Sequence, residues 1–410
     1  MVWAYYETGV HRYDRIRRRL AETGGRTLGP KSFAGTPPNP EPRTPTTIAM
    51  YPLLEPQTDL SVFVLGAPSF YGGADTELWH TLRLWRRGGA GVTIVPTWRI
   101  DAAWRRRCEG IGCRVESIGG PEQLAQVPGL AGGTVVSFCN GNFLEAAGRI
   151  RRLGCRVVWA GCMLWMFDAE RRHYDRCGTF DRYVFQSRYQ RTTLEPELRR
   201  YGYSPGQGAV IRGAFEVDEF PFHPLAHAAG EPFVVGRISR ADPAKYAADT
   251  WSVYRGIDHP IRARVMAWDR RIARKLGRCP EWAECLAAGA EPSAEFLGRL
   301  HCMIQRGDCR ENWPRSGLEA MALGVPIVAQ NHSGWREMIR DGETGFLVDG
   351  PEGAAERATR LARDETLRVQ IARNARDALE NELACPDRIW EAWRKLLAGV
   401  RSETEATIAT

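Results

Sequence analysis

The chain has 410 residues, of which 43% are hydrophobic and 26% are charged. This length exceeds one ordinary domain, and this composition is that of a globular protein with about two domains. No run approaches the roughly 18 uninterrupted apolar residues of a membrane-spanning helix. The amino terminus also lacks the basic, apolar and small-residue order of a signal peptide, so the sequence predicts a cytoplasmic protein.

The net charge of +7 belongs to the first half of the chain. Residues 1–222 contain 29 Lys plus Arg and 22 Asp plus Glu, whereas residues 223–410 contain 27 of each. This asymmetry indicates an anionic partner for the first half. An anionic membrane, contacted peripherally at its inner face, and a polyanionic substrate fit this charge, with nucleic acid as the less favoured partner. The alternative is a solvated, arginine-rich face.

The eleven cysteines form no CxxC pair. Neither a disulfide framework nor a zinc knuckle is indicated, so we interpret them as buried thiols and expect no metal site.

The elements begin after an extension. Residues 1–57 combine a basic stretch with a proline-rich run typical of an extended linker. From residue 58 to residue 222, short β-rich runs alternate with helical segments, among them a helix that follows Gly72 and Gly73 and one from Tyr189 to Tyr201. The β-rich runs are 60–66, 91–96, 133–139, 156–160 and 182–187. The alternation predicts parallel strands joined by crossover helices.

A second cycle of the same kind occupies residues 223–385. A helix is expected from Pro243 to Arg255, and the last helical segment begins near residue 386. The β-rich runs are 233–236, 262–268, 300–305, an apolar run after Pro326, and 345–348. The sequence therefore predicts an α/β protein with two helix-covered sheets.

The stretch that begins at Glu311 carries the strongest functional pattern. Pro314 suits the first position of a helix and Gly324 suits its end, so a helix is predicted from Pro314 to Leu323. The free N–H groups at the start of this helix would favour an anion such as a diphosphate. Those groups belong to Arg315, Ser316 and Gly317.

Two carboxylates flank that helix start. Glu319, one turn inside the helix, is a good two-point acceptor for the hydroxyls of a ribose. Glu311, in the preceding loop, can do the same for a sugar on the far side of the diphosphate. The pair suggests a site for a sugar nucleotide.

These residues resemble the donor-site signature of retaining family 4 glycosyltransferases, or glycosyl transferases group 1. Glu311 and Glu319 lie ahead of "AMALGVPIVA" and "GWREMIRDGETGFLV", and four looser segments keep the family's order: "GGADTEL", "QSRYQRTTLEPEL", "VIRGAFEVDEF" and "VVGRIS". The resemblance covers about residues 59–400 and is specific from Glu311 to Val348. It implies the GT-B fold, with two Rossmann-like α/β/α domains and a deep interdomain cleft.

The same resemblance implies a division of labour along the chain. Residues 58–222 would form the acceptor domain and residues 223–385 the nucleotide-sugar donor domain. Residues 386–410 would form a helix and tail that cross back to the first domain, so Trp390 and Trp393 are expected to pack rather than to bind ligand.

Site residues follow from the resemblance residue by residue. Arg237 and Lys245 would bind the donor diphosphate, and Glu311 would hold the transferred sugar; these three form the expected catalytic set. Arg237 follows a strand end, where open α/β sheets bind ligands, and Lys245 is one of only four lysines. The expected donor-binding residues are Glu319, Arg315, Ser316, Gly317, Asn312, Trp313, Gly72 and Gly73.

Two departures from the family pattern stand out. The loop after the first glutamate usually reads Gly-Phe-Gly-Leu, but here it is Asn312-Trp313-Pro314-Arg315. A histidine often follows the strand at 156–160, but this chain has Gly161-Cys162-Met163. The nearest histidine, His173, is expected on a helix surface, which leaves the acceptor-side residue unassigned.

The implied function is transfer of a sugar from a UDP-, GDP- or ADP-sugar to a glycan, lipid-linked or small-molecule acceptor, with retention of anomeric configuration. No cofactor is expected, and the absence of a D-x-D triplet predicts metal-independent transfer. One alternative is a catalytically inactive GT-B binding or scaffold subunit. Others are a transferase acting on nucleic acid or another polyanion, and a sugar-nucleotide epimerase.

Overall fold

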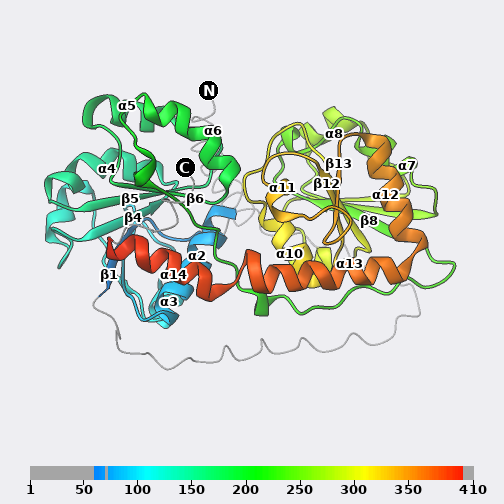
Figure 1. The fold of residues 1–410 in the computed structure, drawn as a ribbon, viewed down its shortest axis with the longest axis horizontal. Helices are drawn as coiled ribbons and strands as arrows, with labels where there is room; N and C mark the ends of the chain where they lie inside the picture. The colour runs from blue at the N-terminus through cyan, green and yellow to red at the C-terminus, as the bar shows by residue number, and fades with distance from the viewer. Residues whose placement is uncertain (1–59, 70–72, 400–410) are drawn as a thin grey trace, which may run out of the picture. The chain divides into compact units, whose positions relative to one another are not determined.

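The computed structural model describes residues 60–69 and 73–399, all within one compact unit, Tyr51–Thr410. The predicted extension at 1–57 and the predicted donor-site residue Gly72 lie outside the described residues. The described part contains two parallel sheets, each flanked by helices (Figure 1). The expected α/β architecture of two Rossmann-like domains is confirmed.

The first sheet has the order β3-β2-β1-β4-β5-β6-β7, and all its neighbouring strands are parallel. Its strands are β1 Ser61–Leu65, β2 Gly91–Val95, β3 Arg114–Val115, β4 Thr134–Phe138, β5 Arg156–Gly161, β6 Arg182–Phe185 and β7 Gly208–Val210. The helices between them are α2 Gly73–Arg87, α3 Ala102–Gly110, η1 Pro121–Gln126, α4 Gly141–Arg152, α5 Asp168–Cys177, α6 Arg188–Arg199 and η2 Pro205–Gln207.

The side chains of the central strand β1 point alternately to the two faces of this sheet and belong to two different apolar clusters. Val62 and Val64 belong to one apolar cluster, whereas Phe63 and Leu65 belong to the other. Successive side chains of a strand point to opposite faces, so a strand covered on both sides must be apolar throughout. This is why the run at 60–66 reads as a continuous apolar segment.

The second sheet has the order β10-β9-β8-β11-β12-β13 and is also parallel. A short helix, η3 Val217–Glu219, precedes it. Its strands are β8 Phe233–Ile238, β9 Ile261–Met266, β10 Ala283–Leu286, β11 Cys302–Gln305, β12 Ile327–Gln330 and β13 Phe346–Val348. Its helices are η4 Pro243–Lys245, α7 Thr250–Arg255, α8 Arg270–Leu276, α9 Ser293–Leu297, α10 Arg315–Leu323, α11 Trp335–Met338, α12 Pro351–Arg363 and α13 Glu365–Ala378.

The strand order of the second sheet reverses between β8 and β11. Ligands of open parallel sheets bind beyond the carboxyl ends of the strands at such a switch point. The segments that follow β8 and β11 are therefore the expected walls of a site. The boundary predicted at residue 222 lies between β7 and β8, and the assignment of acceptor and donor roles to the two domains stays a prediction.

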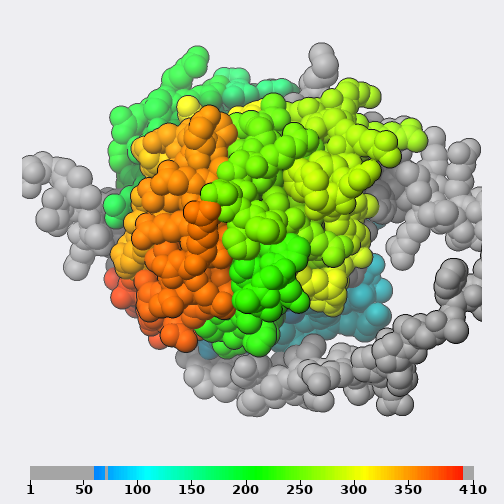
Figure 2. All heavy atoms as spheres, turned by 90° about the vertical axis from the view of Figure 1, so that its right-hand side faces the viewer, coloured from blue at the N-terminus to red at the C-terminus, as the bar shows by residue number. Residues whose placement is uncertain are grey.

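The outer face of the second domain is formed by packed helices and an irregular segment. α12 packs against α7, and Arg368 of α13 donates a 2.8 Å hydrogen bond to the carbonyl of Leu225. Figure 2 shows α12 and α13 in orange beside the green chain on this face.

The carboxyl-terminal helix packs against the first domain. α13 continues through η5 Leu379–Leu383 into α14 Pro386–Ala398, which packs against α2. Trp393 is buried with its ring 4.9 Å from that of Trp85. Trp390 approaches Gly88 so closely that a Cβ atom there would lie 2.2 Å from the indole. The predicted packing role of Trp390 and Trp393 is confirmed.

The helix predicted from Pro243 to Arg255 is interrupted. It consists of η4 and α7, with an irregular link between them. The carbonyl of Lys245 accepts a hydrogen bond from the Arg237 guanidinium, and the N–H of Ala247 donates to the carbonyl of Arg306. Backbone groups that a continuous helix needs are thus used by tertiary contacts.

Three smaller predictions were wrong. Cys279 and Cys285 form a disulfide, so the cysteines are not all thiols. His173 is buried on α5 and stacks on Phe180 rather than lying on a surface. α10 begins at Arg315, because Pro314 has the extended conformation of a cap residue, with ψ of 113°.

Among residues 60–69 and 73–399, no helix is both long enough and apolar enough to cross a membrane.

Candidate functional site

The candidate site lies where β8 and β11 end. The segment after β8 leads to η4 with Lys245, and the segment after β11 leads through Glu311 to α10. Two backbone hydrogen bonds fix the Glu311 loop: its N–H donates to Ser333 Oγ at 3.2 Å, and its carbonyl accepts from the Gly334 N–H at 2.9 Å. Glu311 is therefore held rigidly although it lies in a loop.

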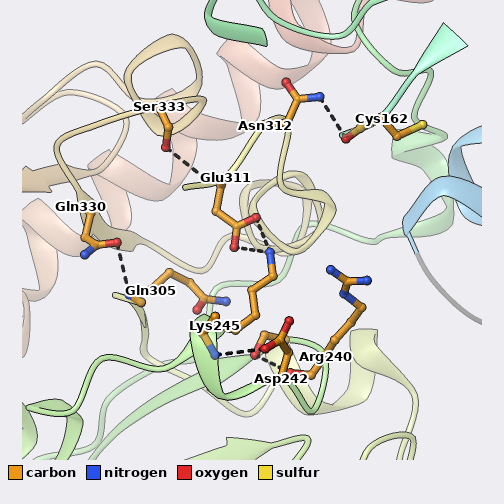
Figure 3. A network of polar contacts seen from close by, with 12 residues as sticks. Cys162, Arg240, Asp242, Lys245, Gln305, Glu311, Asn312, Gln330 and Ser333 are labelled. Carbon is orange, nitrogen blue, oxygen red and sulfur yellow. Dashed lines mark hydrogen bonds and ion pairs between the residues drawn. The ribbon is translucent and has the colours of Figure 1, made fainter. Parts of the chain in front are cut away.

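Lys245 and Glu311 form a two-point ion pair. Nζ of Lys245 lies 2.7 Å from Oε1 and 2.6 Å from Oε2 of Glu311. Figure 3 shows the ammonium and the carboxylate directed toward each other from η4 and from the loop before α10. Both side chains are partly exposed, at 15% and 25%. The structure thus brings together Lys245, which was expected to bind the diphosphate of a donor, and Glu311, which was expected to bind its sugar.

Arg237 lies behind this pair and points into the domain. Its side chain is 2% exposed, and it donates to the carbonyls of Arg306 and Lys245 and to the side chain of Gln305. Its guanidinium also stacks over the ring of Tyr246 at 4.1 Å. These contacts hold the backbone of Lys245 in place. Direct binding of a diphosphate by Arg237 stays a prediction.

Arg240 supplies an exposed cation near the pair, which the sequence pattern did not predict. It follows β8 by two residues, and its side chain is exposed. Figure 3 shows the Arg240 guanidinium on the same side of η4 as the ammonium of Lys245. The signal in the sequence was weak, because an arginine in a loop after a strand is common in an arginine-rich chain.

Glu319 lies one turn inside α10 and is held by a neighbouring hydroxyl. The Ser293 side chain hydrogen-bonds to the Glu319 carboxylate. Burial raises the pKa of Glu319 above its ordinary value, and the positive charge of Arg315 opposes this shift. The side chain stays partly accessible. Its predicted role at a ribose is untested.

The start of α10 offers fewer free N–H groups than predicted. The Gly317 N–H donates to the carbonyl of Pro314 at 3.0 Å, which leaves those of Arg315 and Ser316 without a backbone acceptor within the described chain. A Cβ atom on Gly317 would lie 2.6 Å from Met338 Sδ and 2.8 Å from the Trp335 ring. Gly317 thus allows α11 to pack closely against α10.

Arg315 is directed toward the first domain. Its Nη1 donates to the carbonyl of Ala214 at 2.6 Å, and its Nη2 donates to His80 Nδ1 at 2.7 Å. A Cβ atom on Gly73 would lie 3.1 Å from Cγ of Arg315. The structure therefore places Gly73 beside Arg315, whose side chain is buried. The approach of Gly73 to a donor phosphate stays a prediction.

A buried polar cluster surrounds Arg315. Since arginine only donates, Nδ1 of His80 must accept, which leaves Nε2–H of His80 to face Glu219 at 3.4 Å. Burial lowers the pKa of His80, so the ring is neutral near pH 7. Burial raises the pKa of Glu77, while Arg315 and a hydrogen bond from Gln186 oppose that rise.

Asn312 contacts the first domain rather than the donor side of its loop. Its Oδ1 accepts from Ser187 Oγ at 2.6 Å, and its Nδ2 donates to Gln186 Oε1 at 2.6 Å and to the carbonyl of Cys162 at 3.2 Å. The neighbouring Trp313 is 4% exposed and belongs to the apolar core of the second domain. The departure from Gly-Phe-Gly-Leu thus provides contacts between the two domains.

Among the residues that the structure describes, no group of three or more His, Cys, Asp or Glu side chains is arranged to hold a metal ion.

Part of the second domain matches a known protein family. Residues 290–378, which include α10 and the Glu311 loop, match the family described as glycosyl transferases group 1. The capsular polysaccharide biosynthesis glycosyltransferase CapM of Staphylococcus aureus is 34% identical over 98 residues, or 23% of this chain and 26% of CapM. N-acetyl-alpha-D-glucosaminyl L-malate synthase of Bacillus anthracis is 39% identical over 88 residues, or 21% of this chain and 23% of the synthase. The chain thus spans about a quarter of the length of these relatives.

Solved structures resemble nearly the whole described part. Anabaena HepE in complex with UDP-glucose matches with a TM-score of 0.66 and 17% identity over 83% of this chain and 100% of HepE. A TarM mutant of S. aureus in complex with Fondaparinux, alpha-GlcNAc-glycerol and UDP matches with a TM-score of 0.63 and 10% identity over 82% of this chain and 99% of TarM. At these identities the likeness concerns the fold, and the expected GT-B fold is confirmed.

Proposed function

We propose that the protein is a glycosyltransferase of the retaining family 4 that transfers a sugar from a nucleoside diphosphate sugar to an acceptor. The observation that carries this proposal is the Lys245–Glu311 pair at the carboxyl edge of the second sheet, in front of α10 and Glu319. The family match over residues 290–378 and the UDP-glucose in the complex of HepE support the same assignment.

The geometry suggests how a donor would be held. A diphosphate that binds Lys245 would also lie near the exposed Arg240 (Figure 3). The first N–H groups of α10 would favour the same anion through the helix dipole. Release of Lys245 leaves the Glu311 carboxylate free to accept hydrogen bonds from hydroxyls of the transferred sugar. Glu319, held by Ser293, would accept from the ribose.

Catalysis in this arrangement relies on position and charge. The bond between the anomeric carbon and the diphosphate oxygen breaks while the acceptor oxygen bonds to the same face of that carbon. The proton of the acceptor hydroxyl passes to the departing diphosphate. Lys245 and the α10 N–H groups stabilise the negative charge that develops on the leaving group, and this step needs no nucleophile from the protein.

The altered loop after Glu311 fits an active enzyme. The alternative of an inactive subunit rests on the altered loop after Glu311 and on the missing histidine after β5. The first ground is weakened, because Asn312 joins the Glu311 loop to Ser187, Gln186 and Cys162 of the first domain. These contacts brace the loop that carries Glu311. They favour an active enzyme over a scaffold.

A thermal-shift screen with UDP, GDP, ADP and their common sugar conjugates tests the proposal. A ligand at 100 times its dissociation constant adds about 2.7 kcal/mol to the stability of the folded state. Glu319→Ala should remove the shift caused by the nucleotide, whereas Glu311→Ala should remove the additional shift caused by the sugar. A chain that responds to none of these compounds would speak against the assignment.

Metal independence and retention form part of the proposal. Turnover of the donor identified by the screen should persist in EDTA, and nuclear magnetic resonance of the product should show the anomeric configuration of the donor. Loss of turnover in EDTA, with recovery on adding Mg²⁺ or Mn²⁺, would contradict metal-independent transfer.

A further inference from the structure

A recess lined by both domains lies beside the loop that carries Glu311. It has a volume of about 440 Å³, within the range of ligand pockets. From the first domain, the start of α6 contributes Arg188, Tyr189 and Thr192. The second domain contributes Arg310, His332, Ser333, Arg336 and Glu337. None of these residues belongs to the predicted donor site.

Its three arginines carry unneutralised charge. Within the described chain, the guanidinium of Arg188 has no hydrogen-bond or ion-pair partner. Arg310 donates only to the hydroxyl of Tyr189, at 3.0 Å, and Arg336 only to the amide oxygen of Asn331, at 2.9 Å. All three side chains are exposed, whereas the buried Arg264 pairs with Glu284 and Glu291.

The one carboxylate in the lining, Glu337, offsets only part of this positive charge. Glu337 accepts hydrogen bonds from the first two N–H groups of α6, those of Arg188 at 3.0 Å and Tyr189 at 2.7 Å. Its oxygens are thus directed at backbone donors rather than at a guanidinium. Burial lowers the pKa of His332, and the charges of Arg310 and Arg336 lower it further. The histidine is therefore a neutral hydrogen-bonding group near pH 7.

The recess adjoins the carboxylate that we assign to the transferred sugar. Arg310 directly precedes Glu311, and Ser333 of the lining accepts the Glu311 N–H. A ligand in the recess would therefore lie next to the loop that carries Glu311. Tyr189, Thr192 and Ser333 add hydroxyls suited to a polar ligand.

We propose that this recess binds an anionic group, a phosphate or a carboxylate, of the acceptor through Arg188, Arg310 and Arg336. The proposal rests on the proposed function, because it names the chemistry of the acceptor for the same reaction. Guanidinium groups bind phosphate and carboxylate through paired N–H donors, which gives both charge and geometry. A neutral acceptor has no anionic group for these three arginines to bind.

Calorimetric titration of the full chain with three probes tests this inference: glucose 6-phosphate, methyl glucuronide and methyl glucoside. The phosphate and carboxylate probes distinguish the two anions, and the neutral glucoside tests whether charge is needed. We expect at least one charged probe to bind and the neutral probe not to bind. Arg188→Gln and Arg336→Gln should each weaken the charged probe by about tenfold.

Controls separate this site from the donor site. The titrations are repeated with saturating UDP, which occupies the diphosphate position. Arg373→Gln, which removes an exposed arginine from α13, should leave probe binding unchanged. The inference would be overturned if the neutral probe bound as tightly as a charged probe. It would also be overturned if UDP abolished binding of the charged probe, or if the Arg188→Gln/Arg336→Gln double variant bound that probe with unchanged affinity. Failure of the wild type to bind any nucleotide or sugar nucleotide would instead count against the proposed function.

Discussion

Lys245 and Glu311 neutralise each other through two short contacts, of 2.7 and 2.6 Å, between Nζ and the two carboxylate oxygens. A diphosphate that binds Lys245 must therefore compete with Glu311. A sugar hydroxyl that binds Glu311 must likewise displace Lys245. The complete donor can satisfy both groups at once, whereas a free nucleotide leaves the carboxylate without a partner.

Glu311→Gln should therefore distinguish recognition of the nucleoside diphosphate from recognition of the sugar. Removing the carboxylate charge frees Lys245, so we expect UDP to bind as tightly as in the wild type or about two- to tenfold more tightly, an effect of about 0.4 to 1.4 kcal/mol. The gain in affinity that the sugar adds should disappear. Calorimetry with UDP and with UDP-sugar measures both quantities.

The Lys275–Asp308 pair supplies a matched control. Asp308 lies in the same loop, three residues before Glu311, but its partner Lys275 belongs to α8. Asp308→Asn removes one negative charge near the site without releasing Lys245, so UDP affinity should stay close to that of the wild type. Weaker UDP binding in Glu311→Gln would contradict the proposal that the diphosphate and Glu311 compete for Lys245.

Gly334→Ala should displace the loop that carries Glu311. The backbone of Gly334 has ordinary helical angles, but a Cβ atom would lie 1.5 Å from the carbonyl oxygen of Asn312. The backbone must move, which breaks the hydrogen bond from the Gly334 N–H to Glu311. We expect a destabilisation of about 1 to 3 kcal/mol and loss of sugar-dependent binding, measured by urea unfolding and calorimetry.

Gly353→Ala is the corresponding control in α12. There a Cβ atom would meet Val348 at 3.6 Å, an ordinary contact. Because alanine favours a helix over glycine, this change should leave stability unchanged or raise it by up to about 1 kcal/mol. Equal behaviour of the two alanine variants would refute the argument about close backbone approach.

Asn312→Ala should loosen the contact between the two domains. It removes hydrogen bonds to Ser187, Gln186 and Cys162 and leaves the buried amide of Gln186 without one partner. We expect a loss of about 1 to 3 kcal/mol in stability and a larger radius of gyration in X-ray scattering. Asn381→Ala, which removes an exposed hydrogen bond from η5 to the carbonyl of Asp377 in α13, should change neither quantity.

The parts of the structure that the sequence predicted are those set by local pattern. The apolar runs at 60–66 and 233–236 became central strands because both faces of each sheet are covered, and Gly324 ends α10 with φ of 85°. The two-residue strand β3 has no pattern of its own and was missed. Its pairing with β2 depends on tertiary contact.

Side-chain direction was the part that pattern could not predict. Nothing local distinguishes Arg237, which turns inward to carbonyls, from Arg240, which is exposed three residues later. Asn312 and Arg315 were assigned to the donor because the family's loop binds it, yet their partners come from segments more than 100 residues away. Such partners become visible only when both domains are in place.

Glu170 provides a prediction about pH. This residue of α5 is 4% exposed; its carboxylate accepts hydrogen bonds from the Phe167 N–H at 2.7 Å and the Tyr174 hydroxyl at 3.2 Å. Burial raises its pKa to about 7, against an ordinary value of 4.5. The folded protein therefore keeps this proton over a range in which the unfolded chain has lost it.

A raised pKa stabilises the folded state at low pH, and this contribution is lost as pH rises from about 4.5 to about 7. The shift corresponds to about 3 kcal/mol at most. Glu170→Gln keeps a hydrogen-bond acceptor but cannot ionise, so it should lack this dependence. We expect the free energy of unfolding of the wild type, relative to that of Glu170→Gln, to fall as pH rises across this window. Urea unfolding at pH 5 and pH 7.5 measures the difference, and a constant offset between the two proteins would show that Glu170 does not titrate as its burial implies.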